Sequence, residues 1–243
     1  MNRLSTMFGY RVFISLGIFF LTNPGSAQDY QIAIFSIPCA SVEMNQSEPG
    51  KLNFRTKSIG IIDLIWPEDN RYTTHYDSVN FAVKSFEKQI NQGNFSQKLN
   101  FTVDENTGVF RYNDETDVQR KPGTQTIFTL LARVSKETAA QLDTYWFPME
   151  HEGQAYQMRL LWSDSTELKI GKNNYNCDHY RLDIEPTDDP PINIIDHSDY
   201  FSEYIVHPTA IRQLWVEKNG RRRIIMASVK LMGLTLEAKL LNE

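Results

Sequence analysis

Residues 211–240 read IRQLWVEKNGRRRIIMASVKLMGLTLEAKL and carry the clearest fold signals of the chain. Leucines and an alanine alternate with polar residues over 234–240, which is typical of a β-strand with one face in the core. Asn219-Gly220 favours a two-residue hairpin turn, because both residues tolerate the positive φ of a type I′ turn. With that turn, Glu217 would lie opposite Arg222 and Trp215 opposite Ile224. The segment therefore predicts a hairpin followed by a last strand.

The arginine run 221–223 lies just after the predicted turn. A nucleic-acid surface needs a wide basic face, whereas this chain has a formal net charge of −5. We therefore expect the three arginines to form a solvated hairpin tip, and we expect no nucleic-acid partner.

The same strand pattern extends back through most of the chain. Short segments rich in β-branched and aromatic residues alternate with turn signals such as Glu152-Gly153, an arrangement that favours an antiparallel sheet. The predicted strands are 52–66, 72–83, 97–103, 109–114, 145–151, 154–162, 166–170, 177–184, 211–217, 223–231 and 234–240. We predict a mainly β fold, an antiparallel curved sheet, barrel-like or a sandwich, in a single domain over residues 48–243.

One segment has helical periodicity instead. Ile127, Leu130, Leu131 and Val134 are spaced i, i+3, i+4 and i+7, which predicts a short amphipathic helix packed on the sheet. Its apolar stripe is expected to be plain core, with a lid over an apolar ligand cavity as the alternative. A second helical turn is expected over 138–142, capped by Ser135, and residues 185–199 are expected to form a loop.

The N-terminus predicts export. Residues 1–27 combine arginines, a short apolar run and small residues before a cleavage point after Ala27, as in a secretory signal peptide. The run is too short to span a bilayer easily, so we expect no transmembrane span after cleavage and a periplasmic or secreted protein. Residues 28–47 are interpreted as a lead-in holding at most a short strand.

Only two cysteines are present, Cys39 and Cys177. An oxidising compartment would allow a disulfide between them, and two buried free thiols are the alternative.

Four segments of residues 48–241 form a recognisable pattern: EPGKLNFRTKSIG (48–60), SFEKQINQGNFSQKLNFTVDENTGVF (85–110), residues 153–184 and the terminal segment. In these segments the chain resembles a family of exported bacterial proteins that is catalogued only as a domain of unknown function. Trp215, Arg222, Arg223 and Gly233 match its pattern of an aromatic strand, a charged turn and a last strand introduced by glycine. The resemblance implies a β-rich, barrel-like domain outside the cytoplasm with no established activity, and it supplies no catalytic residues. Glu48-Pro49-Gly50 departs from the compact glycine-glutamate pair that the pattern would have.

Two charged clusters could furnish metal ligands. One contains Asp196, His197, Asp199 and His207, and the other is Glu150-His151-Glu152. Neither has the spacing of a known zinc motif, and both are expected to be wet surface. We therefore assign no catalytic, cofactor or metal residue. The sequence favours non-catalytic binding of an apolar small molecule, a lipid or an envelope protein, and the alternative is a metal-assisted hydrolase that uses the 196–207 loop.

Overall fold

A computed structural model describes residues 27–241 of the chain. Within them, all strands belong to one antiparallel sheet of fourteen strands, in the order β8-β7-β6-β5-β4-β3-β2-β1-β14-β13-β12-β11-β10-β9. The predicted signal peptide lies, apart from Ala27, outside the described residues.

The strands and helices have the following bounds: β1 Ala27–Ile34, β2 Ile37–Asn45, β3 Lys51–Ser58, α1 Gly60–Ile65, β4 Asp69–Tyr76, β5 Val83–Gln92, β6 Phe95–Asp104, β7 Val109–Tyr112, β8 Thr116–Gln119, α2 Ile127–Val134, α3 Ala139–Leu142, β9 Trp146–His151, β10 Gln154–Ile170, β11 Asn173–Pro186, α4 Tyr200–Val206, β12 Ile211–Glu217, β13 Ile224–Leu231 and β14 Leu234–Leu240.

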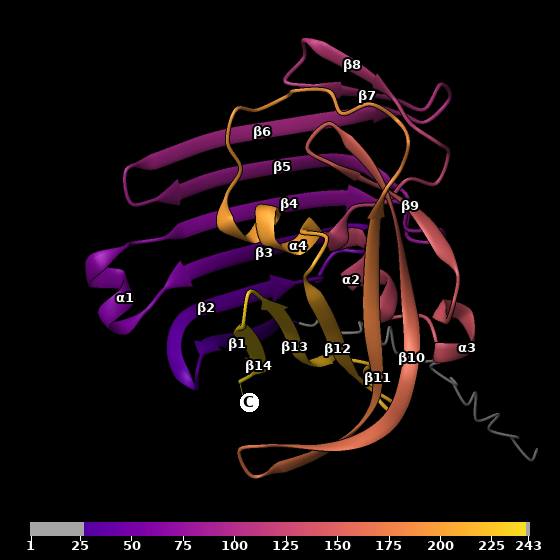
Figure 1. Ribbon diagram of the computed structural model, residues 1–243. Coiled ribbons are helices and arrows are strands. Elements are labelled where there is room, and N and C mark those ends of the chain that lie inside the picture. Colours follow the sequence, from indigo (N-terminus) through magenta and orange to yellow (C-terminus); the bar gives the residue numbers. More distant parts are fainter. Residues whose placement is uncertain (1–26, 242–243) are drawn as a thin grey trace, which may run out of the picture.

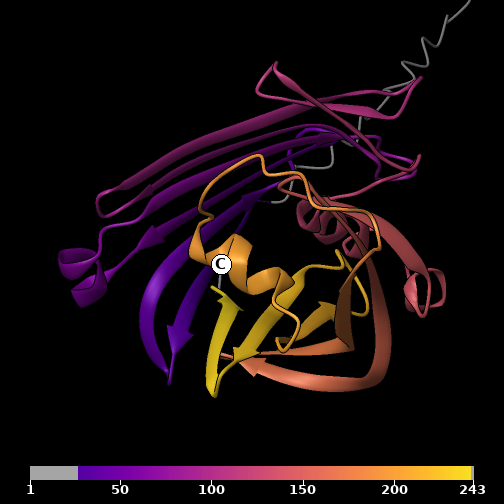
Figure 2. The ribbon, with the colours of Figure 1, turned by 45° about the horizontal axis from the view of Figure 1, so that its top comes forward.

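The sheet curls around its own concave face, and α2 and α4 lie on that side (Figures 1 and 2). It does not close by pairing β8 with β9. Instead, the segment that follows β8 runs along β9, where the Gln125 N–H donates to the Pro148 carbonyl at 2.9 Å and the Glu150 N–H donates to the Gln125 carbonyl at 2.9 Å. The expectation of a mainly β, antiparallel, barrel-like fold is confirmed, in the form of one curled sheet.

Residues 28–47 are part of this sheet rather than a lead-in to it. β1 pairs with β14 on one side and with β2 on the other, and β2 pairs with β3. Tyr30, Val42 and Met44 are buried in the core. The polar residues that follow this segment suggested a loose attachment, yet Gln28 and Tyr30 of β1 and Val42 and Met44 of β2 are buried at every second position, as in a core strand.

The predicted helix over 127–134 is confirmed as α2. Thr126 caps it, since its hydroxyl accepts the Thr129 N–H while the Thr129 hydroxyl accepts the Thr126 N–H. The helix is buried on most sides rather than along one stripe, and Phe128 packs against the rings of Phe54, Tyr72 and Phe201. Its apolar stripe is therefore core. α3 also forms where helical structure was expected, but its capping box is made by Thr138 and Gln141 rather than by Ser135.

Two helices were not predicted. α1 interrupts the predicted strand 52–66, where Gly60 has a φ of 63° that leaves the extended region. α4 follows the predicted 185–199 loop, whose last residue, Asp199, is its N-cap. No helix described between residues 27 and 241 is long and apolar enough to cross a membrane.

The terminal hairpin forms, but its predicted turn and register are wrong. Residues 218–223 make a wider connection in which Gly220 and Arg222 have positive φ, at 85° and 51°. Trp215 faces Met226 rather than Ile224, because the wider connection shifts the register by one residue and the bulge between Trp215 and Val216 shifts it by another. The wider loop lets Arg222 fold back, so that its Nη1 lies 3.5 Å from the nearly buried carboxylate of Asp178. Arg221 is exposed, but Arg222 and Arg223 are partly buried. The arginine run as a whole is therefore not the solvated hairpin tip that was expected.

Candidate functional site

The turn between β9 and β10 brings one of the two charged clusters inward. Glu152 and Gly153 form this two-residue turn with φ values of 52° and 90°. A β-carbon on Gly153 would lie 2.2 Å from the carbonyl oxygen of Ile192, so glycine is needed for the turn to pack against the 187–198 segment. This cluster was expected to be wet surface. Glu150 and Glu152 are instead covered by the segments packed around the turn.

Glu150 belongs to a buried network beside this turn. Its carboxylate pairs with Arg120 and accepts the Tyr112 hydroxyl at 2.6 Å and the Gly153 N–H at 2.7 Å. Arg120 also donates from Nη2 to the Gly153 carbonyl at 2.9 Å. Since every polar group here is satisfied within the protein, the network holds the turn in place.

The second cluster contributes Asp199, which is completely buried. Its Oδ1 accepts the Ser202 N–H at 3.0 Å, as the cap of α4, and the Tyr72 hydroxyl at 3.0 Å. Its Oδ2 lies 2.7 Å from Nζ of Lys88, which is also buried. Burial on its own would raise the pKa of Asp199, but the Lys88 charge and these hydrogen bonds outweigh it and lower the pKa below its usual value.

Lys88 links the two clusters. Besides Asp199, its ammonium group pairs with Glu152 and lies 3.5 Å from the Ser198 hydroxyl. Lys88 is on β5, Glu152 is on the β9–β10 turn and Asp199 caps α4, so one buried cation fixes three distant segments at the same point. The lysine stands on the inward face of β5 with Phe86 and Ile90. That alternation is visible in the sequence and could have identified Lys88 as a buried charge.

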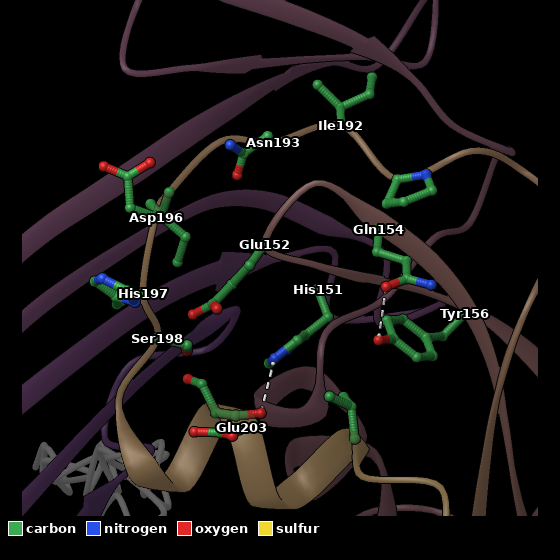
Figure 3. A pocket seen from close by; sticks show the side chains of 14 residues that line it. His151, Glu152, Gln154, Tyr156, Ile192, Asn193, Asp196, His197, Ser198 and Glu203 are labelled. Atoms are coloured by element: carbon green, nitrogen blue, oxygen red, sulfur yellow. Dashed lines mark hydrogen bonds between the residues drawn. The ribbon is translucent and has the colours of Figure 1, made fainter.

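A pocket of about 420 Å³ adjoins this ion-pair cluster, since Glu152 and Ser198 line it (Figure 3). Its polar lining includes His151 and Glu152 from the turn, Asp196, His197 and Ser198 from the segment before α4, and Glu203 of α4. Its apolar lining includes Tyr156, Pro191, Ile192, Ile195 and Val206. The pocket therefore combines carboxylates with apolar side chains in one lining.

His151 has a defined orientation in the pocket. Its Nε2 lies 3.0 Å from the carbonyl oxygen of Ser202. A carbonyl oxygen only accepts hydrogen bonds, so Nε2 carries the proton. His197 is placed by its backbone, whose carbonyl accepts the Gln97 amide at 2.6 Å.

The structure thus brings His151, Glu152, Asp196 and His197 to one pocket, whereas Glu150 and Asp199 turn into the core. His207 lies apart at the C-terminal end of α4, where its Nδ1 is 3.1 Å from the Thr209 hydroxyl. Across residues 27–241, no three His, Cys, Asp or Glu side chains are grouped so that they could hold a metal ion. The hydrolase alternative required such a group in the 196–207 loop.

Both cysteines are buried free thiols in the structure. The Cys39 thiol on β2 lies 3.4 Å from the Ile32 carbonyl oxygen, and the Cys177 thiol on β11 lies 3.6 Å from the Tyr175 carbonyl oxygen. The alternative of two buried thiols is the one that the structure displays.

No protein-family model matches the chain, and no curated protein matches it by sequence. Among solved structures, it is similar to the crystal structure of a β-barrel-like protein of the domain of unknown function DUF1849 from Brucella abortus, with a TM-score of 0.57 and 11% sequence identity. The match covers 90% of this chain and 96% of that one. At this identity the likeness concerns the fold, and it agrees with the resemblance to a bacterial domain of unknown function.

Proposed function

We propose that the protein is exported and acts as a non-catalytic binding protein, whose ligand enters the pocket between the β9–β10 turn, residues 191–198 and α4. The ligand class that fits is an amphiphile with a positively charged group. The observation that carries this proposal is that one pocket is lined both by the carboxylates of Glu152, Asp196 and Glu203 and by the apolar side chains of Tyr156, Ile192, Ile195 and Val206.

Charge balance supports a cationic group in the ligand. The Lys88 ammonium is shared between Glu152 and Asp199 deeper in the protein. Asp196 and Glu203 have no such cation in the pocket lining, apart from histidine. A ligand cation at this position would gain attraction from both carboxylates.

The composition of residues 1–27 supports export, and the pairing of β1 is compatible with cleavage after Ala27. Gln28 would then be the first residue, and its side chain is buried and accepts the Tyr30 hydroxyl at 2.9 Å. Cleavage there leaves the remainder of β1 with its pairing to β2 and β14. Fractionation of the producing cells and N-terminal sequencing test this part, and retention of residues 1–27 in a cytoplasmic product would refute it.

The ligand class is tested by titration calorimetry with decyltrimethylammonium bromide and sodium decanesulfonate, both below their micelle concentrations. The cationic amphiphile should bind and the anionic one should not. Glu203→Gln should weaken binding about fivefold, as expected for the loss of one ion pair at an exposed carboxylate. Val206→Trp should abolish binding, because the larger side chain would fill the pocket space beside the apolar residues. Glu167→Gln, on the distant β10–β11 hairpin, is the matched control and should bind as the parent does. Equal affinity for the two amphiphiles would contradict the proposal.

A further inference from the structure

The Asn219-Gly220 pair favours a tight hairpin turn in the sequence, but it lies in a longer connection between β12 and β13. Residues 218–221 of this connection are exposed, and strand pairing ends at Val216 and Ile224. Asn219-Gly220 is also the only Asn-Gly sequence in the chain. The pair is therefore exposed and free of the constraint that a two-residue turn would impose.

Neither the side-chain amide of Asn219 nor the backbone N–H of Gly220 is engaged elsewhere. Two N–H groups next to the pair are hydrogen-bonded, since Glu217 donates to the Arg223 carbonyl and Lys218 to the Asn176 carbonyl, both at 2.8 Å. The Gly220 N–H, in contrast, has no acceptor within residues 27–241. Both groups of the pair are therefore available for reaction with each other.

A backbone nitrogen that follows asparagine can attack the side-chain amide of that asparagine. The Gly220 nitrogen would form a bond to Cγ of Asn219, the bond from Cγ to Nδ2 would break, and ammonia would leave with the proton of the Gly220 N–H. Water then opens the succinimide ring at either carbonyl and gives isoaspartate or aspartate. The reaction needs a free N–H, an uncrowded nitrogen and a backbone that can turn toward the side chain, and a glycine in an exposed connection meets these needs.

Other asparagines lack at least one of these conditions. The Asn70 amide is buried, donates to Glu68 at 2.8 Å and accepts the Asn91 N–H at 2.9 Å. Asn94 is exposed on the β5–β6 turn, but its next residue is Phe95, which has a bulky side chain and is paired within the sheet. The structure therefore separates Asn219 from these residues.

A reaction at Asn219 would alter the connection that holds Arg222. Isoaspartate carries the main chain through its β-carbon, which lengthens the connection, and both products add a carboxylate. The Glu217 carboxylate already lies beside Gly220, 3.7 Å from where a β-carbon would be, so the new charge would repel it. Arg222 reaches the nearly buried Asp178 from this same connection, at 3.5 Å. The modified protein should therefore be less stable.

We propose that Asn219 is a site of spontaneous deamidation in the folded protein, and that its products weaken the contact of Arg222 with Asp178. The reaction uses only water and does not involve the pocket. Because the connection is exposed and the Gly220 N–H is free, the rate in the native protein should be within about tenfold of the rate in a free peptide of the same sequence.

The test keeps the mature protein at pH 8 and 37 °C for several weeks, beside a free peptide of residues 214–224. Cleavage after glutamate then releases residues 218–237, in which Asn219 is the only asparagine, and residues 88–105, which contain three asparagines. Mass spectrometry detects the change from amide to acid, and chromatography separates the isoaspartyl from the aspartyl peptide. We expect both products in 218–237, while 88–105 keeps its amides.

Asn219→Gln is the matched control, since its extra methylene makes ring closure slow, and it should keep both its amide and its urea midpoint during the incubation. Gly220→Ala should slow the reaction several-fold, because its methyl group crowds the nitrogen. Alanine is strained at the φ of 85° found here, so the urea midpoint of this variant is measured first. If it does not fold, the comparison of the parent with the free peptide still decides the proposal.

Two results would overturn the proposal. If Asn219 stays intact in the native protein while the free peptide reacts, the fold protects this site. If the deamidated fraction has the urea midpoint of fresh parent protein, its products do not weaken the contact of Arg222 with Asp178.

Discussion

Arg120 and Glu150 form a buried ion pair between the two edges of the open sheet. Arg120 follows directly after β8, and Glu150 lies on β9, the strand at the opposite edge. The pair stands where a closed barrel would have strand pairing, and it is accompanied by the backbone hydrogen bonds of Gln125. The curl of the sheet therefore depends on side chains at the gap as well as on strand pairing.

Arg120→Met should destabilise the protein by about 3–5 kcal/mol, because it leaves the Glu150 carboxylate buried without its cation. The double variant Arg120→Met/Glu150→Met should recover part of this loss, since neither charge then remains buried. Urea unfolding measures both. Arg111→Met is the control on the same hairpin, where Arg111 and Asp117 form an exposed pair, and its urea midpoint should match that of the parent. If Arg120→Met is as stable as the parent, the Arg120–Glu150 pair does not stabilise the gap between the two sheet edges.

Asp199→Asn should produce a pH-dependent loss of stability. The pKa of Asp199 is lowered in the folded protein, so its charge stabilises the fold above the carboxyl pKa of the unfolded chain, about 4. This contribution is complete at neutral pH and is lost as the pH falls below 4 and through the lower pKa of the folded state. The difference in unfolding free energy between parent and variant should therefore be large at pH 7 and shrink toward pH 3.

Urea titrations at pH 7, 5, 4 and 3 provide this comparison. Asp188→Asn is the control in the preceding exposed loop and should show no such trend. If the difference in unfolding free energy between the parent and Asp199→Asn stays constant from pH 7 to pH 3, the charge of Asp199 does not stabilise the fold.

The strand pattern was sufficient to predict the type of fold. Alternation in 234–240 and at other strands reports a sheet with one buried face, and the spacing of Ile127, Leu130 and Val134 reports α2. α1 was missed because its run of isoleucine and leucine has high strand propensity, while its helical form depends on the positive φ of Gly60. The register of the last hairpin was missed because its loop is widened where Arg222 folds back toward Asp178 on β11, and because of the bulge between Trp215 and Val216.

Half of the candidate site was within reach of the sequence. His151, Glu152, Asp196 and His197 were recognised as charged clusters, but nothing local indicates that the two clusters meet. Their meeting depends on Lys88. This lysine occupies an inward position of β5, where the alternation of apolar and polar residues would place an apolar side chain. A buried lysine requires carboxylate partners, yet the residues that supply them lie far away in the chain.

Arg222→Ala should be more damaging than Arg221→Ala. Arg222 is mostly buried and faces Asp178, which also accepts the Trp162 indole N–H at 3.4 Å, whereas Arg221 is exposed. Removing Arg222 should cost about 1–3 kcal/mol because a buried carboxylate loses a charged donor. Removing Arg221 should change stability by no more than about 0.5 kcal/mol. Urea midpoints of the two variants test this. Equal midpoints would show that Arg222 is no more important for stability than Arg221, as expected of a solvated hairpin tip.

Thiol titration should find two reactive cysteines per chain, and only after unfolding. Burial raises the pKa of the Cys177 thiol to about 12, and it also raises the pKa of the Cys39 thiol. Since the thiolate is the reactive form, neither cysteine should react rapidly with Ellman's reagent at pH 8 in the native protein. In about 6 M guanidinium chloride, well above the usual unfolding range, both should react without a reducing agent. A Cys39→Ser variant should then release one equivalent instead of two. If the unfolded parent reacts only after reduction, Cys39 and Cys177 are joined in the exported protein, and β2 and β11 must approach one another more closely than the structure has them.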